Sequence, residues 1–124
     1  MAHILLAEDD DAMRRYLTSA LRGAGHYVTA VDNGLKALEQ MSEIETDLLL
    51  ADVVMPGLDG VELARRAAKD RPHLKVMFIT GFAAVALNER QQHAAGTRVL
   101  SKPFHLRELV SEIEAMLECD HEAG

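Results

Sequence analysis

The sequence is poor in the residues that crosslink small secreted domains and in the long apolar runs that span membranes. It has one cysteine, Cys119, so no disulfide can form within the chain, and a reducing, cytoplasmic location is expected. No apolar run approaches the ~20 residues of a membrane-spanning helix. Residues 1–3 lead into the first apolar run without the basic segment of a signal peptide. These absences predict a cytoplasmic protein without membrane insertion.

Positive charge is also scarce. The 13 lysines and arginines face 20 acidic residues, which leaves a formal net charge of -7. This balance argues against broad contact with the phosphate backbone of nucleic acid. It suits partners with positive surface patches, or a bound cation. The length of 124 residues is that of one ordinary domain, which needs no structural metal to hold its core.

What the sequence does contain is a regular alternation of short apolar runs with stretches of helical apolar spacing. The short runs predict strands at residues 4–7, 26–31, 48–51, 76–79 and 99–100. The other stretches predict helices at residues 13–21, 35–41, after Asp59, at 83–94, and from Pro103 to Leu117. Five such units predict an α/β fold, a doubly wound five-stranded parallel sheet with helices on both faces. We expect one domain over residues 1–119 and a disordered polar tail over residues 120–124.

Polar side chains follow four of the five predicted strands, at the edge where parallel sheets bind ligands. They are Glu8, Asp9, Asp10 and Asp11 after the first strand, Asp52 after the third, Thr80 after the fourth, and Ser101 and Lys102 after the fifth. Carboxylates a few ångströms apart repel one another, so they share protons or hold a metal. An all-oxygen site of this kind suits Mg²⁺. A carboxylate beside Mg²⁺ and an amine can itself accept a phosphoryl group.

Each of these residues also has a purely structural interpretation. Asp10 or Asp11 is expected to cap the following helix, Asp59 to cap the third helix, and Asp47 to mark a strand entry. Asp52 alone could be a loop acid, Thr80 a turn hydroxyl and Lys102 a solvated lysine. The coincidence of all these residue types after the appropriate strands favours a site.

The whole chain resembles the receiver domain of two-component response regulators. The segments that carry the resemblance are Ile4–Asp10, Asp52–Gly60, Phe78–Gly81 and Ser101–Phe104. The resemblance implies a flavodoxin-like, CheY-like fold in which Asp52 accepts a phosphoryl group from a histidine kinase or a histidine phosphotransferase. It also implies that the chain is not an enzyme but a phosphoacceptor that assists its own phosphorylation and dephosphorylation.

The resemblance further implies a role for each site residue. Asp9, Asp52 and the backbone carbonyl of Val54 would ligate Mg²⁺ directly, and Glu8 would act through water. Thr80 and Lys102 would contact the phosphoryl oxygens.

A narrower resemblance, to the CpdR regulators of bacteria, rests on residues 5–11 and 77–88. Those regulators are stand-alone receivers that act as adaptors for the ClpXP protease in cell-cycle control, and they are active when unphosphorylated. This resemblance implies ClpX, or another component of a protease adaptor system, as a partner.

One position departs from the receiver pattern. Receivers carry a switch aromatic three residues before the lysine, and here that position is Val99. Phe82, in the loop after Thr80, is the nearest aromatic that could replace it. Phe82 could equally pack on the fourth helix.

Other functions remain open from the sequence. A Mg-dependent aspartyl-phosphate hydrolase would need an acid two residues beyond its nucleophile, and Val54 stands there. A receiver that only binds partners would be expected to lack part of the acidic set. A CheY-like, phosphorylation-activated regulator and a phosphorelay intermediate are the nearer alternatives.

Overall fold

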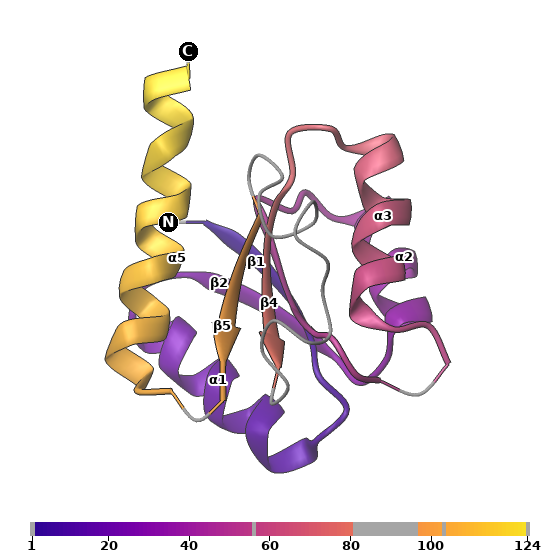
Figure 1. Cartoon of the computed structure of the whole chain (residues 1–124), viewed down its shortest axis with the longest axis horizontal. Coiled ribbons are helices and arrows are strands. Elements are labelled where there is room, and N and C mark those ends of the chain that lie inside the picture. Colours follow the sequence, from indigo (N-terminus) through magenta and orange to yellow (C-terminus); the bar gives the residue numbers. More distant parts are fainter. Residues whose placement is uncertain (1, 56, 81–96, 103, 124) are drawn as a thin grey trace.

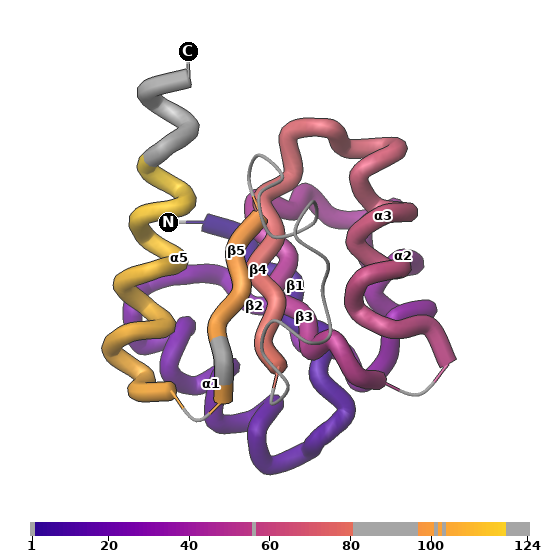
Figure 2. The backbone as a smooth tube through the Cα atoms, in the orientation of Figure 1, coloured from indigo at the N-terminus to yellow at the C-terminus, as the bar shows by residue number. Residues whose placement is uncertain are grey.

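The computed structural model describes residues 2–55, 57–80, 97–102 and 104–123, and leaves the side chains of Ser101 and residues 119–123 undescribed. Within these residues, five parallel strands form one sheet in the order β2-β1-β3-β4-β5. All five are labelled in Figure 2. Their bounds are β1 His3–Ala7, β2 Tyr27–Val31, β3 Leu48–Asp52, β4 Lys75–Thr80 and β5 Thr97–Ser101. This strand order is that of the flavodoxin-like, CheY-like fold, so the predicted architecture is confirmed.

Four helices of the described residues cover the two faces of the sheet (Figure 1). They are α1 Asp11–Gly23, α2 Gly34–Glu43, α3 Gly60–Asp70 and α5 Leu106–Ala123. Helices α1 and α5 pack on one face around Leu17, Leu21, Leu109 and Ile113. Helices α2 and α3 pack on the other face through residues such as Met41 and Leu63. None of these helices is long and apolar enough to cross a membrane.

The central strand explains why the site lies where it does. All five residues of β3 are buried, as expected for a strand with a helical layer on each face. Its last residue is Asp52, so the fold places a carboxylate at the carboxyl end of its most buried strand. The neighbouring ends of β1, β4 and β5 meet it there, because parallel strands end at a common edge.

The acidic caps have the structural roles expected of them. The Oδ1 atom of Asp10 accepts the backbone N–H of Met13 at 3.0 Å and caps α1. Asp59 accepts the N–H of Glu62 at 2.8 Å and caps α3. Asp47 accepts the N–H of His3 at 2.8 Å, where β1 begins.

The last helix differs from the prediction at its start. It begins at Leu106 and not at Pro103, because its first backbone bond runs from the N–H of Leu109 to the carbonyl of His105. Upstream, the N–H of Lys102 still bonds to the carbonyl of Thr80, so the chain follows the sheet to that residue. Pro103 itself lies outside the described residues, as does the predicted helix at 83–94.

The last helix also differs at its end. Its bounds include residues 120–123, for which the sequence predicts a disordered tail. No glycine or proline stands between Leu106 and Ala123 to end the helix sooner.

Gly60, the first residue of α3, allows the helix to approach the site closely. A Cβ atom there would lie 2.2 Å from the backbone oxygen of Asp52 and 2.9 Å from its carbonyl carbon. Both atoms belong to the backbone and cannot rotate away. Gly60→Ala is therefore expected to lower the free energy of unfolding by roughly 1–3 kcal/mol, measured by urea denaturation.

Gly23→Ala is the matched control, because a Cβ at Gly23 meets nothing within 4 Å. It should leave stability unchanged or slightly raised. Equal stability of the Gly60 and Gly23 variants would contradict the close approach of α3 to β3.

Candidate functional site

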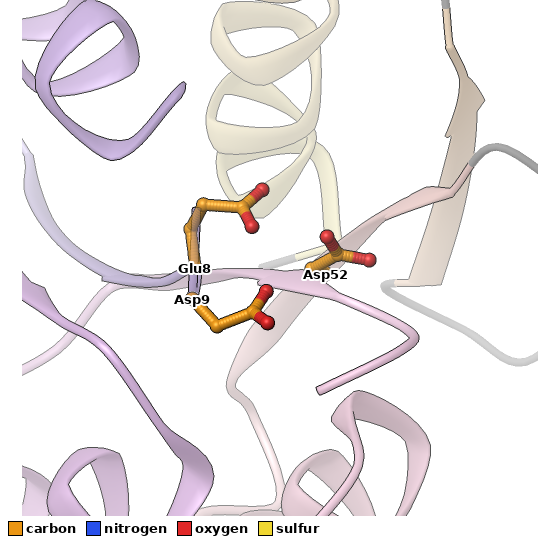
Figure 3. A group of neighbouring side chains, drawn as sticks. All are labelled: Glu8, Asp9 and Asp52. Atoms are coloured by element: carbon orange, nitrogen blue, oxygen red, sulfur yellow. The ribbon is translucent and has the colours of Figure 1, made fainter. Parts of the chain in front are cut away.

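The centre of the candidate site is a group of three carboxylates. Glu8 and Asp9 follow β1, and Asp52 ends β3. Each offers an oxygen, and these oxygens all lie within 4.8 Å of one another. Figure 3 shows the carboxylates of Glu8 and Asp9 directed toward Asp52. The strand order brings them together, because β1 and β3 are neighbours in the sheet.

Lys102 adds one positive charge to this group. Its Nζ atom lies 3.1 Å from Oδ2 of Asp52 and 3.6 Å from Oε1 of Glu8. The lysine directly follows β5, and its backbone N–H donates to the carbonyl of Thr80 at 2.8 Å. That bond fixes the start of the lysine side chain relative to β4.

Burial makes these charges interact strongly. The Glu8 side chain is fully buried, and Asp52 is 7% exposed, whereas Asp9 is exposed. The pKa of Glu8 is raised from 4.5 to about 7, chiefly by burial and also by the nearby carboxylate of Asp52. The N–H of Asp10 and the charge of Lys102 act in the opposite direction without cancelling the shift. Without a metal, Glu8 is therefore about half protonated near neutral pH.

Lys102 remains an ammonium in this setting. Partial burial alone would lower its pKa, but the hydrogen bond to Asp52 and the charge of Glu8 outweigh this effect and raise it. At neutral pH the site therefore holds a fixed cation beside Asp52.

The Asp52 carboxylate is held at both of its oxygens. Its Oδ1 atom accepts the backbone N–H of Val54 at 3.1 Å, and its Oδ2 atom accepts from Lys102. The side chain of Val54 points into solvent and is 56% exposed. Val54 therefore contributes its backbone N–H to the site.

Arg14 supports the turn that carries the acidic pair, and the sequence alone did not single it out. Its Nη1 atom donates to the backbone carbonyl of Glu8 at 2.9 Å, and its other guanidinium nitrogen pairs with Asp11. An arginine in the first turn of a helix is too common to indicate such a contact by itself. The signal in the sequence is its position three residues beyond the end of the acidic run Glu8–Asp11.

The structure places the remaining predicted residues as follows. Thr80 is fully buried at the end of β4. Val99 is half-buried and packs against the core between the sheet and helices α2 and α3, with Phe78 beside it in register. The position of the expected switch aromatic thus holds a small aliphatic side chain in the sheet. Phe82 lies outside the described residues.

This arrangement fits a divalent cation and a nucleophile. Three carboxylates against one ammonium leave an excess of negative charge, which oxygen-bound hard cations neutralise. The cluster combines the buried Glu8 with the exposed Asp9, so one side is open to an ion or a substrate. Asp52 has two defined neighbours and a small exposed surface.

Comparison with known proteins agrees with this geometry. Residues 4–114 match the family of the response regulator receiver domain. The chain is 60% identical over 117 residues to the response regulator receiver protein CpdR of Brucella abortus (strain 2308), covering 94% of this chain and 98% of that protein. It is also 39% identical to part of the sensor kinase CckA of the same strain, covering 94% of this chain and 13% of the kinase.

Solved structures give the same result. The receiver domain of the hybrid histidine kinase CckA superposes with a TM-score of 0.79 at 32% identity, covering 93% of this chain and 98% of that one. The response regulator TrrA of Thermotoga maritima, solved in complex with Mg²⁺-BeF, superposes with a TM-score of 0.83 at 26% identity. That comparison covers 94% of this chain and 99% of the TrrA chain.

Proposed function

Because this chain belongs to the response regulator receiver domain family, we propose that it is a single-domain response regulator of a two-component phosphorelay in the bacterial cytoplasm. It takes a phosphoryl group on Asp52 and passes the signal on by contact with other proteins. The observation that carries this proposal is the Asp52 carboxylate at the end of β3, within 4.8 Å of two further acids and 3.1 Å from Lys102.

In this proposal the acidic group holds Mg²⁺. Asp9, Asp52 and the backbone carbonyl of Val54 would ligate the ion directly, and Glu8 would act through water. Bound Mg²⁺ neutralises charge on the phosphoryl oxygens. The structural likeness to TrrA, solved with Mg²⁺-BeF, supports this assignment.

The chain's own residues then perform the transfer. A carboxylate oxygen of Asp52 attacks the phosphorus atom of a phosphohistidine, the new P–O bond forms, and the P–N bond to the histidine breaks. Lys102 neutralises negative charge beside Asp52, and the Thr80 hydroxyl donates to a phosphoryl oxygen. The donor is a histidine kinase or a histidine phosphotransferase. The same groups assist the later hydrolysis of the acyl phosphate.

The direct test is phosphorylation of the purified chain by acetyl phosphate. With Mg²⁺ present, intact-mass measurement should show one added phosphoryl group per chain. Chelation of Mg²⁺ by EDTA before the reaction should prevent the addition. Equal labelling with and without the metal would contradict a Mg²⁺-dependent acceptor.

Mg²⁺ should also stabilise the fold, because it relieves repulsion among Glu8, Asp9 and Asp52. Saturating Mg²⁺ is expected to raise the melting temperature by a few degrees, as a ligand specific to the folded state does. Asp9→Ala should remove most of this rise. Because Asp9 is exposed, the substitution itself should cost little. The same Mg²⁺-induced shift in both proteins would place the ion elsewhere.

We further infer a CpdR-like output, in which the unphosphorylated form acts as an adaptor for the ClpXP protease in cell-cycle control. The 60% identity to CpdR of Brucella abortus, over 98% of that protein, supports this inference. A phosphoryl group on Asp52 would attract the side chains of Thr80 and Lys102 at the ends of β4 and β5 and so change the surface near them. A partner that prefers the unphosphorylated conformation would then be released, to an extent set by the difference in its affinity for the two conformations.

The polarity of this switch is tested by binding to purified ClpX. Wild type and Asp52→Ala should bind alike, and the phosphorylated protein roughly tenfold more weakly, a difference of about 1.4 kcal/mol. Tighter binding by the phosphorylated protein would instead favour a CheY-like, phosphorylation-activated regulator. Absence of ClpX binding in every state would favour a phosphorelay intermediate.

A further inference from the structure

The outer edge of β2 is bordered by a groove that the phosphoacceptor site does not use. Among the strands that the structure describes, β2 has a neighbour on one side only, β1. The groove has a volume of about 450 Å³ and lies between this edge and helix α1. Its lining consists of Arg14, Arg15, Thr18, Ser19, Arg22 and Ala30.

The hydrogen bonds of β2 show which of its backbone groups face the groove. The N–H of Tyr27 donates to the carbonyl of Ala2, and the carbonyl of Val31 accepts from Glu8, so residues 27 and 31 turn their polar groups toward β1. Successive residues of a parallel strand alternate in direction, so residues 28 and 30 turn their N–H and carbonyl groups away from β1. Arg22 donates to the carbonyl of Val28 at 3.1 Å, which is consistent with this direction. The N–H and the carbonyl of Ala30 therefore lie along the groove.

The opposite wall of the groove is positively charged, in a chain whose net charge is -7. Arg14, Arg15 and Arg22 all project from α1. Each is held to a backbone carbonyl, of Glu8, Asp11 and Val28 respectively. Bonds to carbonyls fix the guanidinium groups and leave their charge in place, and of the three only Arg14 also pairs with a carboxylate among the residues that the structure describes, that of Asp11.

Two acids near this wall are already in ion pairs. Asp11 pairs with Arg14, and Asp32, just beyond β2, pairs with Lys36 at 3.2 Å. The hydrogen bond from Lys36 keeps the pKa of Asp32 below its ordinary value, and Arg14 contributes in the same direction. The excess of charge along the groove is therefore positive.

We propose that this groove binds an extended, acidic segment of a partner protein, which adds to the sheet as a strand beside β2. The backbone groups of Ala30 would pair with the segment, and alternate carboxylates would reach the arginines of α1. Small side chains at Ala30 and Ser19 leave room for the added strand. Main-chain pairing supplies affinity in this mode of recognition, and the charges supply selectivity.

The test uses a short fluorescent peptide in which glutamate alternates with valine, and a matched peptide with lysine in place of glutamate. Fluorescence anisotropy should show about tenfold tighter binding of the acidic peptide. Arg15→Gln should weaken that binding by about threefold. Arg65→Gln on α3, which packs on the opposite face of the sheet, should leave it unchanged.

Two N-methylated peptides separate strand addition from attraction by charge alone. Each carries methyl groups on alternate backbone nitrogens. One peptide is methylated at the odd-numbered residues and the other at the even-numbered residues, and these are the two phases. One phase should lose about tenfold in affinity, because its methyl groups occupy the nitrogens that would pair with β2, and the other should match the parent. Equal binding of both phases, equal binding of the lysine peptide, an equal effect of Arg65→Gln, or no binding at all would overturn the proposal.

Discussion

Asp52→Asn is expected to abolish phosphorylation of the chain by acetyl phosphate. An amide has neither the charge nor the nucleophilic oxygen needed to form an acyl phosphate. The fold should persist, because asparagine keeps the shape of the side chain and an oxygen that can still accept the N–H of Val54. Intact-mass measurement should therefore show no phosphoryl addition to a protein with a cooperative melting transition. Substantial labelling of Asp52→Asn would disprove the assignment of the acceptor.

Asp59→Asn is the matched control for this experiment. Asp59 is also a carboxylate in the chain that connects β3 to α3, but its oxygen caps α3. Asparagine is an equally good cap, so both the fold and the labelling should be preserved. A loss of labelling in both variants would show that the reaction reports damage to the β3–α3 connection and not the identity of the nucleophile.

The fold was predictable because its signals are local. The apolar run at residues 48–51 is long enough for one buried strand, and such runs alternate with helical spacing throughout the described chain. The caps were predictable for the same reason, since Asp10 and Asp59 bond within three residues of themselves. The sequence left Asp10 and Asp11 as alternatives for the first cap, and the structure selects Asp10. The start of the last helix was not predictable in this way, because a proline favours the first turn of a helix without requiring a helix to begin there. The backbone bond between Lys102 and Thr80 keeps the chain with the sheet beyond β5.

The convergence at the site was predictable for a different reason. Parallel strands end at a common edge, so residues such as Asp9 and Asp52 meet once the strand order is known. The sequence could not give the exposure of each acid. Glu8 is fully buried while its neighbour Asp9 is exposed, because successive side chains after a strand point in different directions. That difference gives the two acids unequal electrostatic environments.

The groove beside β2 could not be predicted from the sequence pattern. It depends on β2 being an edge strand and on the outward direction of the Ala30 backbone, and neither is visible in the apolar pattern. Arginines at positions 14, 15 and 22 look like an ordinary solvated helix face in the sequence. Only their position along the strand edge makes them a candidate docking surface.

The stability of the metal-free protein should fall as the pH rises toward 7. The folded pKa of Glu8, about 7, lies above its ordinary value of 4.5, so the folded state binds this proton more tightly than the unfolded chain does. The contribution of the proton to stability is complete below about pH 4.5 and is lost as the pH rises to about 7. A shift of this size corresponds to at most about 3 kcal/mol. Urea denaturation in EDTA, repeated across this pH range, measures it.

Glu8→Gln isolates this effect from the other titrating groups, because glutamine keeps the shape of the protonated carboxyl and cannot lose a proton. The free energy of unfolding of wild type, relative to Glu8→Gln, should be highest at acidic pH and decline toward pH 8. Mg²⁺ should reverse the decline, because binding the ion releases the proton, and its affinity for wild type should rise by about tenfold per pH unit below pH 7. Parallel pH profiles for the two proteins would show that Glu8 does not hold a proton in the folded, metal-free state. The buried carboxylate would then be stabilised chiefly by Lys102, and Mg²⁺ binding would be independent of pH in this range.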